Sequence, residues 1–219
     1  MFHRPKRNRI PLRLPPREVT RYDPHTEVDP AAVGVEPAAV ELIWEEVERL
    51  YEAGLHPAIS LCIRRRGEVV LNRAIGHTCG NSPMDSAGSP KVPVKPETPF
   101  CIFSASKAIT AIVIHMLDER GFLHVGDRVA DYIPEFGQHG KEWVTIRHVL
   151  THRAGIPSVP SDYAVLELLK DWDRIVELLC DAPLVSAPGR RLAYHAVTGG
   201  FILGEIVRRV TGGTIRQFL

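Results

Sequence analysis

The chain has 219 residues, of which 44% are hydrophobic, and its 27 lysines and arginines nearly balance its 26 acidic residues. This length fits one ordinary domain or part of a larger one, and the apolar content is sufficient for a hydrophobic core. The balanced charge disfavours a nucleic-acid-binding protein. No stretch reaches the roughly 18 apolar residues of a transmembrane segment.

The cysteines and the start of the chain indicate a cellular location. Cys62, Cys79, Cys101 and Cys180 are scattered and form no C-x-x-C pair. This pattern fits reduced thiols better than a disulfide framework. The basic N-terminus lacks the continuous apolar core of a secretory signal. We therefore expect a cytoplasmic protein.

Positive charge is concentrated at the beginning of the chain. Residues 1–21 contain one acidic residue, Glu18, and these basic ones: Arg4, Lys6, Arg7, Arg9, Arg13, Arg17 and Arg21. The composition predicts a solvated, poorly ordered arm, and the alternative is an arm that binds a surface. Residues 22–34 have the character of a linker. We therefore divide the chain into a basic, proline-rich arm with its linker, residues 1–34, and a domain, residues 35–219.

The first regular elements predict an α+β, or mixed α/β, arrangement. A helix is expected from Pro37 to Gly54, because apolar residues recur there at helical spacing: Val40, Ile43, Trp44, Val47, Leu50 and Tyr51. Residues 58–63 and 68–75 are rich in strand formers and are joined by a short turn, which predicts an antiparallel hairpin. A long loop from Gly76 to Pro99 follows, and such loops are often functional.

The second half of the chain is predicted to be helical. Short helices are expected within residues 127–134 and 144–151, an amphipathic helix over 161–181, and another helix over 198–210. His148 and His152 are four residues apart, but Val149 breaks the H-E-x-x-H zinc pattern. A hydrogen-bonded loop histidine is therefore favoured over a metal ligand.

A serine and a lysine stand at the start of an apolar helix that Gly121 ends. On a helix Ser104 and Lys107 share a face, about 5–6 Å apart at Cβ, so the lysine amine can reach the serine oxygen. A serine hydroxyl needs a neighbouring base to become a nucleophile, and S-x-x-K is a catalytic signature. The alternative is that Ser104 or Ser106 only caps the helix while Lys107 points to solvent.

Several motifs then follow in a fixed order. They are Phe103-Ser104-Ala105-Ser106-Lys107, Leu150-Thr151-His152-Arg153-Ala154-Gly155-Ile156-Pro157, Pro188-Gly189, Tyr194 and Gly204. In this order they resemble the serine β-lactamase/penicillin-binding-protein-like hydrolases, in particular the class C-like branch with the β-lactamase-type (family VIII) carboxylesterases. The resemblance runs from about residue 36 to the end. It implies a β-lactamase/transpeptidase-like fold, in which helices flank an antiparallel sheet beside an all-helical region, with the C-terminal part of the fold missing from this chain.

The resemblance also implies catalytic roles. Ser104 would be the acylated nucleophile, and Lys107 would hold or shuttle its proton. Tyr194 matches the tyrosine of the family's Y-x-N motif and would be the general base, its phenol acidified by the lysine charge. Ala196 replaces the asparagine of that motif, which disfavours a β-lactamase. The later strand motif that supplies an oxyanion donor is not in this chain.

These features predict a carboxylesterase or lipase-like enzyme that acts on small-molecule esters and uses no metal or organic cofactor. The loop over residues 76–99 would contribute to the pocket wall. A nucleophile elbow of the G-x-S-x-G type is absent, which disfavours an α/β-hydrolase lipase. Two alternatives stay open: a β-lactamase or D-Ala-D-Ala carboxypeptidase-like amide hydrolase, and a non-catalytic remnant or binding module.

Overall fold

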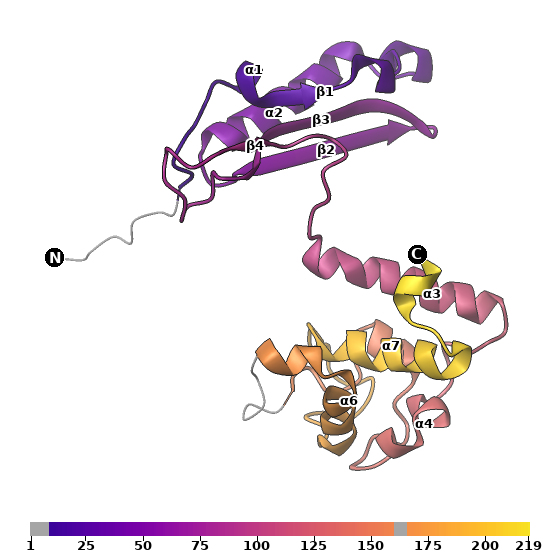
Figure 1. The fold of residues 1–219 in the computed structure, drawn as a ribbon. Coiled ribbons are helices and arrows are strands. Elements are labelled where there is room, and N and C mark those ends of the chain that lie inside the picture. The colour runs from indigo at the N-terminus through magenta and orange to yellow at the C-terminus, as the bar shows by residue number, and fades with distance from the viewer. Residues whose placement is uncertain (1–8, 160–165) are drawn as a thin grey trace. The chain divides into compact units, whose positions relative to one another are not determined.

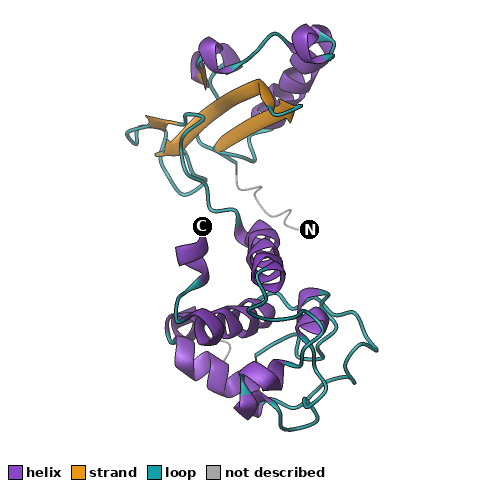
Figure 2. Cartoon of the chain, turned by 90° about the vertical axis from the view of Figure 1, so that its right-hand side faces the viewer, coloured by secondary structure: helices purple, strands orange, loops and turns teal. Residues whose placement is uncertain are grey.

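The computed structural model describes residues 9–159 and 166–219. The chain divides into two compact units, residues 1–100 and residues 101–219, which we call the first and the second unit. The first unit contains the β-sheet, and the second is built from helices and loops (Figures 1 and 2).

A small antiparallel sheet with one long strand at its centre forms the first unit. That strand, β3 (Glu68–Cys79), pairs with β2 (Ala58–Arg65) on one side and with β1 (Thr20–Tyr22) on the other, and the short β4 (Val92–Pro93) pairs with its end. The predicted hairpin is thus present. The loop predicted to begin at Gly76 begins after Cys79 instead, because backbone pairing with β2 and β4 extends the strand.

Helix α2 (Pro37–Glu52) was expected at this position and packs on the sheet (Figure 1). Its Val40, Trp44 and Tyr51 are buried in one cluster with Leu71 and Ile75 of β3. Two of the apolar residues that recur at helical spacing are not buried: Ile43 is 41% exposed and Leu50 is 46% exposed.

The basic N-terminal segment is part of this unit from residue 9 onward. Ile10 and Val19 are buried in the same cluster as Trp44, and the Ile10 N–H donates to the Gly54 carbonyl at 2.9 Å. The short helix α1 (Pro16–Val19) leads into β1, and the 3₁₀ turns η1 (Pro24–Thr26) and η2 (Pro30–Val33) follow. The prediction of a poorly ordered arm is therefore wrong for residues 9–21, because the buried side chains of Ile10 and Val19 anchor this segment. Residues 1–8 lie outside the described part, and the assignment of residues 35–219 to one domain stays a prediction.

The second unit follows the predicted order of helices. Its elements are η3 (Phe103–Ala105), α3 (Ser106–Glu119), α4 (Val129–Tyr132), η4 (Pro134–Phe136), α5 (Ile146–Leu150), η6 (Leu166–Lys170), α6 (Trp172–Asp181), α7 (Thr198–Thr211) and η7 (Ile215–Phe218). One core joins them, and it includes Ile114 of α3, Ile146 of α5, Ile175 of α6 and Ile202 of α7.

Two helices differ from their predictions. The amphipathic helix expected over 161–181 begins only at Trp172, because the Asp171 side chain accepts a hydrogen bond from the Arg174 N–H and caps a new helix there. Residues 160–165 of that prediction lie outside the described residues. Helix α3 was expected only as an apolar helix, and its apolar residues are not all buried: Ile114 is fully buried, but Ile112 is 64% exposed.

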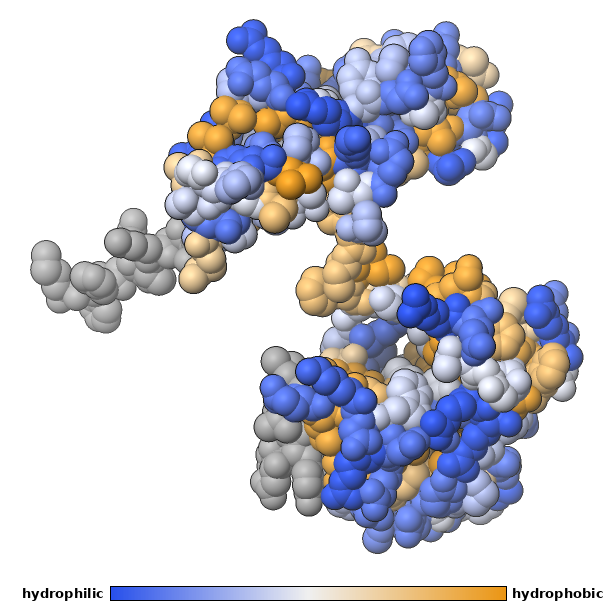
Figure 3. All heavy atoms as spheres, in the orientation of Figure 1, coloured by the Kyte–Doolittle hydropathy of each residue, from blue (hydrophilic) through white to orange (hydrophobic). Residues whose placement is uncertain are grey.

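The surface is mainly polar on the face drawn in Figure 3, where hydrophobic residues lie among hydrophilic ones. None of the helices in residues 9–159 and 166–219 is long and apolar enough to cross a membrane. Within the same residues no group of three or more His, Cys, Asp or Glu side chains is arranged to hold a metal ion.

Candidate active site

Ser104 and Lys107 lie where the turn η3 runs directly into α3. The Lys107 Nζ donates a hydrogen bond to Ser104 Oγ at 3.3 Å, so the contact expected from the i, i+3 spacing is present. The capping alternative is wrong, because the residue before α3 is Ala105 and no side-chain capping bond is formed there. Phe103, immediately before the serine, has a φ of +44°, a conformation that is rare for a bulky residue and is found mainly where surrounding structure enforces it.

Tyr194 meets the same serine from a segment ninety residues later. It lies just before α7, and its OH is 2.7 Å from Ser104 Oγ in a hydrogen bond. The Lys107 Nζ lies 5.0 Å from the centroid of the tyrosine ring. The amine and the phenol therefore converge on one hydroxyl, and the tyrosine side of the site is open, since Tyr194 is 54% exposed.

The surroundings of Tyr194 make its phenol easier to ionise. The pKa of Tyr194 is lowered from its usual 10.0, first by the hydrogen bond with Ser104 and next by the neighbouring Lys107 ammonium. A hydrogen bond and an opposite charge both stabilise the charged form of an acid. The phenolate thus becomes available closer to neutral pH than in a free tyrosine.

The segment that carries Tyr194 is fixed by His152, which the sequence marked only as a loop histidine. The His152 carbonyl accepts from the Ala193 N–H at 3.0 Å, and its Nδ1 accepts from the His195 N–H at 3.2 Å. His195 is fully buried, and its Nε2 accepts from the Ile156 N–H at 3.1 Å. The partners are about forty positions apart in the chain, so local spacing carried no signal for these contacts.

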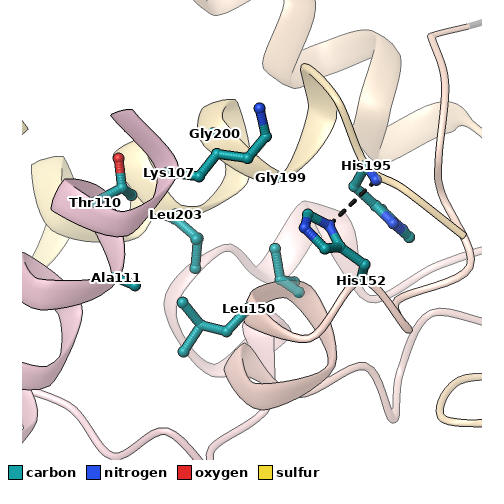
Figure 4. Close-up of a pocket in the computed structure, with 10 residues that line it drawn as sticks. Lys107, Thr110, Ala111, Leu150, His152, His195, Gly199, Gly200 and Leu203 are labelled. Atoms are coloured by element: carbon teal, nitrogen blue, oxygen red, sulfur yellow. Dashed lines mark hydrogen bonds between the residues drawn. The ribbon is translucent and has the colours of Figure 1, made fainter. Parts of the chain in front are cut away.

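A small, mostly apolar pocket, open to solvent, lies next to this cluster (Figure 4). Its wall comes from α3, from the end of α5 and the loop after it, and from α7 and the segment before it: Lys107, Thr110, Ala111, Val149, Leu150, His152, His195, Gly199, Gly200 and Leu203. His152 and His195 lie side by side at one end of it, joined by their hydrogen bond. Ala196, in the position of the expected asparagine, is exposed and presents no amide to the site.

Comparison with known proteins gives a consistent family. Residues 47–219 match the family model described as Beta-lactamase. The Esterase/beta-lactamase LipL of Mycobacterium tuberculosis is 38% identical over 128 residues, which are 57% of this chain and 28% of LipL.

Two solved structures show the same fold. A penicillin-binding protein homologue from Caulobacter crescentus matches with a TM-score of 0.70 and 32% identity, over 82% of this chain and 45% of its own. A family VIII carboxylesterase matches with a TM-score of 0.70 and 30% identity, over 80% of this chain and 46% of its own. The chain thus spans less than half the length of these relatives. The predicted β-lactamase/transpeptidase-like fold is confirmed, and the chain belongs to the β-lactamase family of serine hydrolases, which includes carboxylesterases.

Proposed function

We propose that this protein hydrolyses carboxylic esters through an acyl-enzyme on Ser104, with Lys107 and Tyr194 as its proton-transfer partners. The observation that carries the proposal is the convergence of the Lys107 amine and the Tyr194 phenol on the Ser104 oxygen. A weak nucleophile flanked by a base, and a base oriented by a third group, is the arrangement that nucleophilic catalysis requires.

In the first half of the reaction the Tyr194 phenolate takes the Ser104 proton while the serine oxygen attacks the ester carbonyl. The Lys107 ammonium stabilises the phenolate before the transfer and holds the serine oxygen in place. The phenol then returns its proton to the departing alkoxide, and the acyl group stays on Ser104. The N–H groups at the start of α3 favour the negative charge that develops on the carbonyl oxygen.

In the second half water repeats the same steps. Tyr194 takes a proton from water as it attacks the acyl-serine, and the proton passes to Ser104 as the acid leaves. Each proton removed in one half is returned in that half, so the enzyme is regenerated without a cofactor.

Esters are favoured over amides by two observations. Ala196 leaves no side-chain amide to grip the amide of a β-lactam or peptide. The matched relatives include a carboxylesterase and an esterase/beta-lactamase. The substrates are small-molecule esters, and the cytoplasm is the proposed site of action; the role of residues 76–99 as a pocket wall stays a prediction.

The first test is the replacement Ser104→Ala in the protein. Hydrolysis of p-nitrophenyl esters should be lost, because the substitution removes the hydroxyl on which Lys107 and Tyr194 converge, whereas the neighbouring Ser106→Ala should keep the wild-type rate. Turnover retained by Ser104→Ala would remove the serine from the mechanism. Rapid acylation by labelled penicillin followed by release would favour an amide hydrolase instead.

The same variants separate an enzyme from a non-catalytic remnant. A fluorophosphonate probe should add one adduct to the intact mass of the folded chain, and Ser104→Ala should take none. A folded wild-type chain that acquires no adduct would favour a binding module.

A further inference from the structure

We infer that His152 is a positioning residue for Tyr194, whose main chain and imidazole together fix the phenol on the Ser104 hydroxyl. The inference deepens the proposed function and rests on it. None of the motifs that define the site assigns this role to the histidine.

The main chain on both sides of Tyr194 is tied to this one residue. The residue before the tyrosine, Ala193, donates its N–H to the His152 carbonyl at 3.0 Å. The residue after it, His195, donates its N–H to His152 Nδ1 at 3.2 Å (Figure 4). A residue held at both neighbours has little freedom in its own backbone, so the direction of its Cα–Cβ bond is fixed as well.

The imidazole also contacts the tyrosine ring directly. The two ring centroids are 4.9 Å apart in an edge-to-face arrangement, a favourable geometry for aromatic pairs. On its other side the His152 ring stacks on His195, with centroids 5.9 Å apart. His195 is itself fixed, because its two ring nitrogens bond to the backbone of Ala193 and Ile156. The Tyr194 ring thus packs against the His152 imidazole, which is held in turn by the His195 imidazole.

His152 adopts a backbone conformation that L residues rarely adopt, with a φ of +58°. Glycine would adopt this conformation without strain. It would also lack the Nδ1 acceptor and the ring, so a glycine could form the chain turn here but not the contacts with His195 and Tyr194. Backbone strain of this kind collects at functional sites and needs surrounding structure to hold it.

The contacts of His152 with Ala193, Tyr194 and His195, which we call the clamp, require a neutral imidazole. Since Nδ1 accepts a hydrogen bond from the His195 N–H, its proton must be on Nε2, and a second proton on Nδ1 would break the bond. The titratable groups placed against this ring are Lys107 from α3 and Tyr194 and His195 from the segment before α7. Burial, and next the Lys107 charge, lower the pKa of His152 and so keep it neutral.

The test compares two polar replacements in the protein. In His152→Asn the amide oxygen occupies the place of Nδ1 and can accept the His195 N–H, and asparagine tolerates a positive φ. In His152→Gln the amide lies one bond further out and cannot. His139 supplies a matched control, because it is exposed and has a φ of +54°. His139→Asn and His139→Gln change the same residue type in the same backbone region, at a residue that does not line the pocket.

Two measurements are made on each variant: the rate of fluorophosphonate labelling of Ser104, and the ionisation of Tyr194 by ultraviolet difference spectra against Tyr194→Phe. His152→Gln should label roughly 10–100-fold more slowly, since a misplacement of about 1 Å costs a factor of this size. Its Tyr194 pKa should move up toward 10.0, because the bond to Ser104 is weakened. His152→Asn should keep most of the wild-type labelling rate and most of the lowering of the Tyr194 pKa. The His139 variants should match the wild type in both quantities.

A folded His152→Gln variant with wild-type labelling and an unchanged Tyr194 pKa would overturn the inference. Equal losses of labelling rate in His152→Asn and His152→Gln would also overturn it, since they would show a need for the ring but not for the Nδ1 acceptor.

If His152→Gln does not fold, the dependence of the labelling rate on pH in His152→Asn decides. Wild-type labelling should fall more steeply than that of the variant at acid pH, where Nδ1 becomes protonated, and identical profiles would reject the clamp. A wild-type Ser104 that takes no label would instead reject the proposed function, while the Tyr194 ionisation would still report on His152.

Discussion

At the scale of single residues, the positive charge of Lys107 acts on the pKa of Tyr194, the proposed base. It donates to Ser104 and lies over the Tyr194 ring, and it is the second contributor, after the Ser104 hydrogen bond, to the lowered pKa of that tyrosine. A base with a lowered pKa becomes active at lower pH, so acylation should rise with pH through a midpoint below 10.0.

Lys107→Met tests this link because it keeps the length of the side chain and removes its charge. The midpoint of the acylation–pH profile should move upward, toward the ordinary tyrosine value, and the rate at neutral pH should fall. The measurement is fluorophosphonate labelling as a function of pH, with the exposed Lys170→Met as control. An unmoved midpoint would mean that the lysine charge does not act on the phenol.

The same residues show how far sequence reasoning extends. The Ser104–Lys107 contact follows from helical spacing, which is local. Tyr194 lies ninety residues away, so it was placed only by its resemblance to a family motif. His152 was noticed for its spacing to His148, but its actual partners are Ala193 and His195. Contacts between distant segments, and a positive φ on a non-glycine residue, leave no periodic pattern in a sequence.

At the scale of an element, two glycines of α7 have opposite surroundings. A Cβ at Gly204 would lie 2.5 Å from the Trp172 ring, which is held by a hydrogen bond to Glu205 and by contact with Phe201. A Cβ at Gly200 would meet nothing within 4 Å. The first glycine therefore permits close packing of α7 on α6, whereas the second is a residue of low helix propensity in open space.

The matched pair Gly204→Ala and Gly200→Ala should change stability in opposite directions. Gly204→Ala should lower the free energy of unfolding by about 1–3 kcal/mol, because the tryptophan must shift in a packed region. Gly200→Ala should raise it by up to about 1 kcal/mol through helix propensity. Urea unfolding measures both, and equal effects of the two substitutions would contradict the packing argument.

The elements that were predicted well are those with strong local periodicity, such as α2, α7 and the β2–β3 hairpin. The elements that were missed depend on partners elsewhere in the chain. Strand β1 exists because it pairs with β3, and its segment is anchored by Ile10 and Val19, two apolar residues in a strongly basic stretch. The average composition of this segment reflects its many basic residues, so it gave no indication that Ile10 and Val19 are buried.

At the scale of the whole molecule, buried titratable groups predict how stability depends on pH. On the acid side, burial lowers the pKa of four histidines below 6.5: His77, His148, His152 and His195. The unfolded chain then binds more protons than the folded one as pH falls below 6.5, so stability should decrease there. Measuring the free energy of unfolding from pH 7 downward checks this direction, and a flat profile between pH 6.5 and 5 would contradict it.

On the alkaline side, Cys180 gives the sharpest prediction. Burial raises the pKa of its thiol from 9.0 to about 11. Between these values the unfolded chain releases the proton while the folded chain retains it, so stability falls as pH rises from 9 to 11. Two pKa units correspond to about 2–3 kcal/mol. Lys141, whose pKa is lowered by its own burial, acts in the opposite direction up to pH 10.5, and its charge interacts with that of Cys180. The stability profiles are therefore compared between variants that both contain Lys141.

Cys180→Ala removes the thiol and keeps Lys141. The wild type should lose up to about 2–3 kcal/mol more than this variant between pH 9 and pH 11, whatever constant offset the smaller side chain introduces. The control is Cys101→Ala, which makes the same replacement at an exposed cysteine and should follow the wild type. Urea unfolding at a series of pH values provides the measurement. Parallel profiles for the wild type and Cys180→Ala would mean that the thiol ionises in the folded protein as readily as in the unfolded chain, which a group 2% exposed in an apolar core should not do.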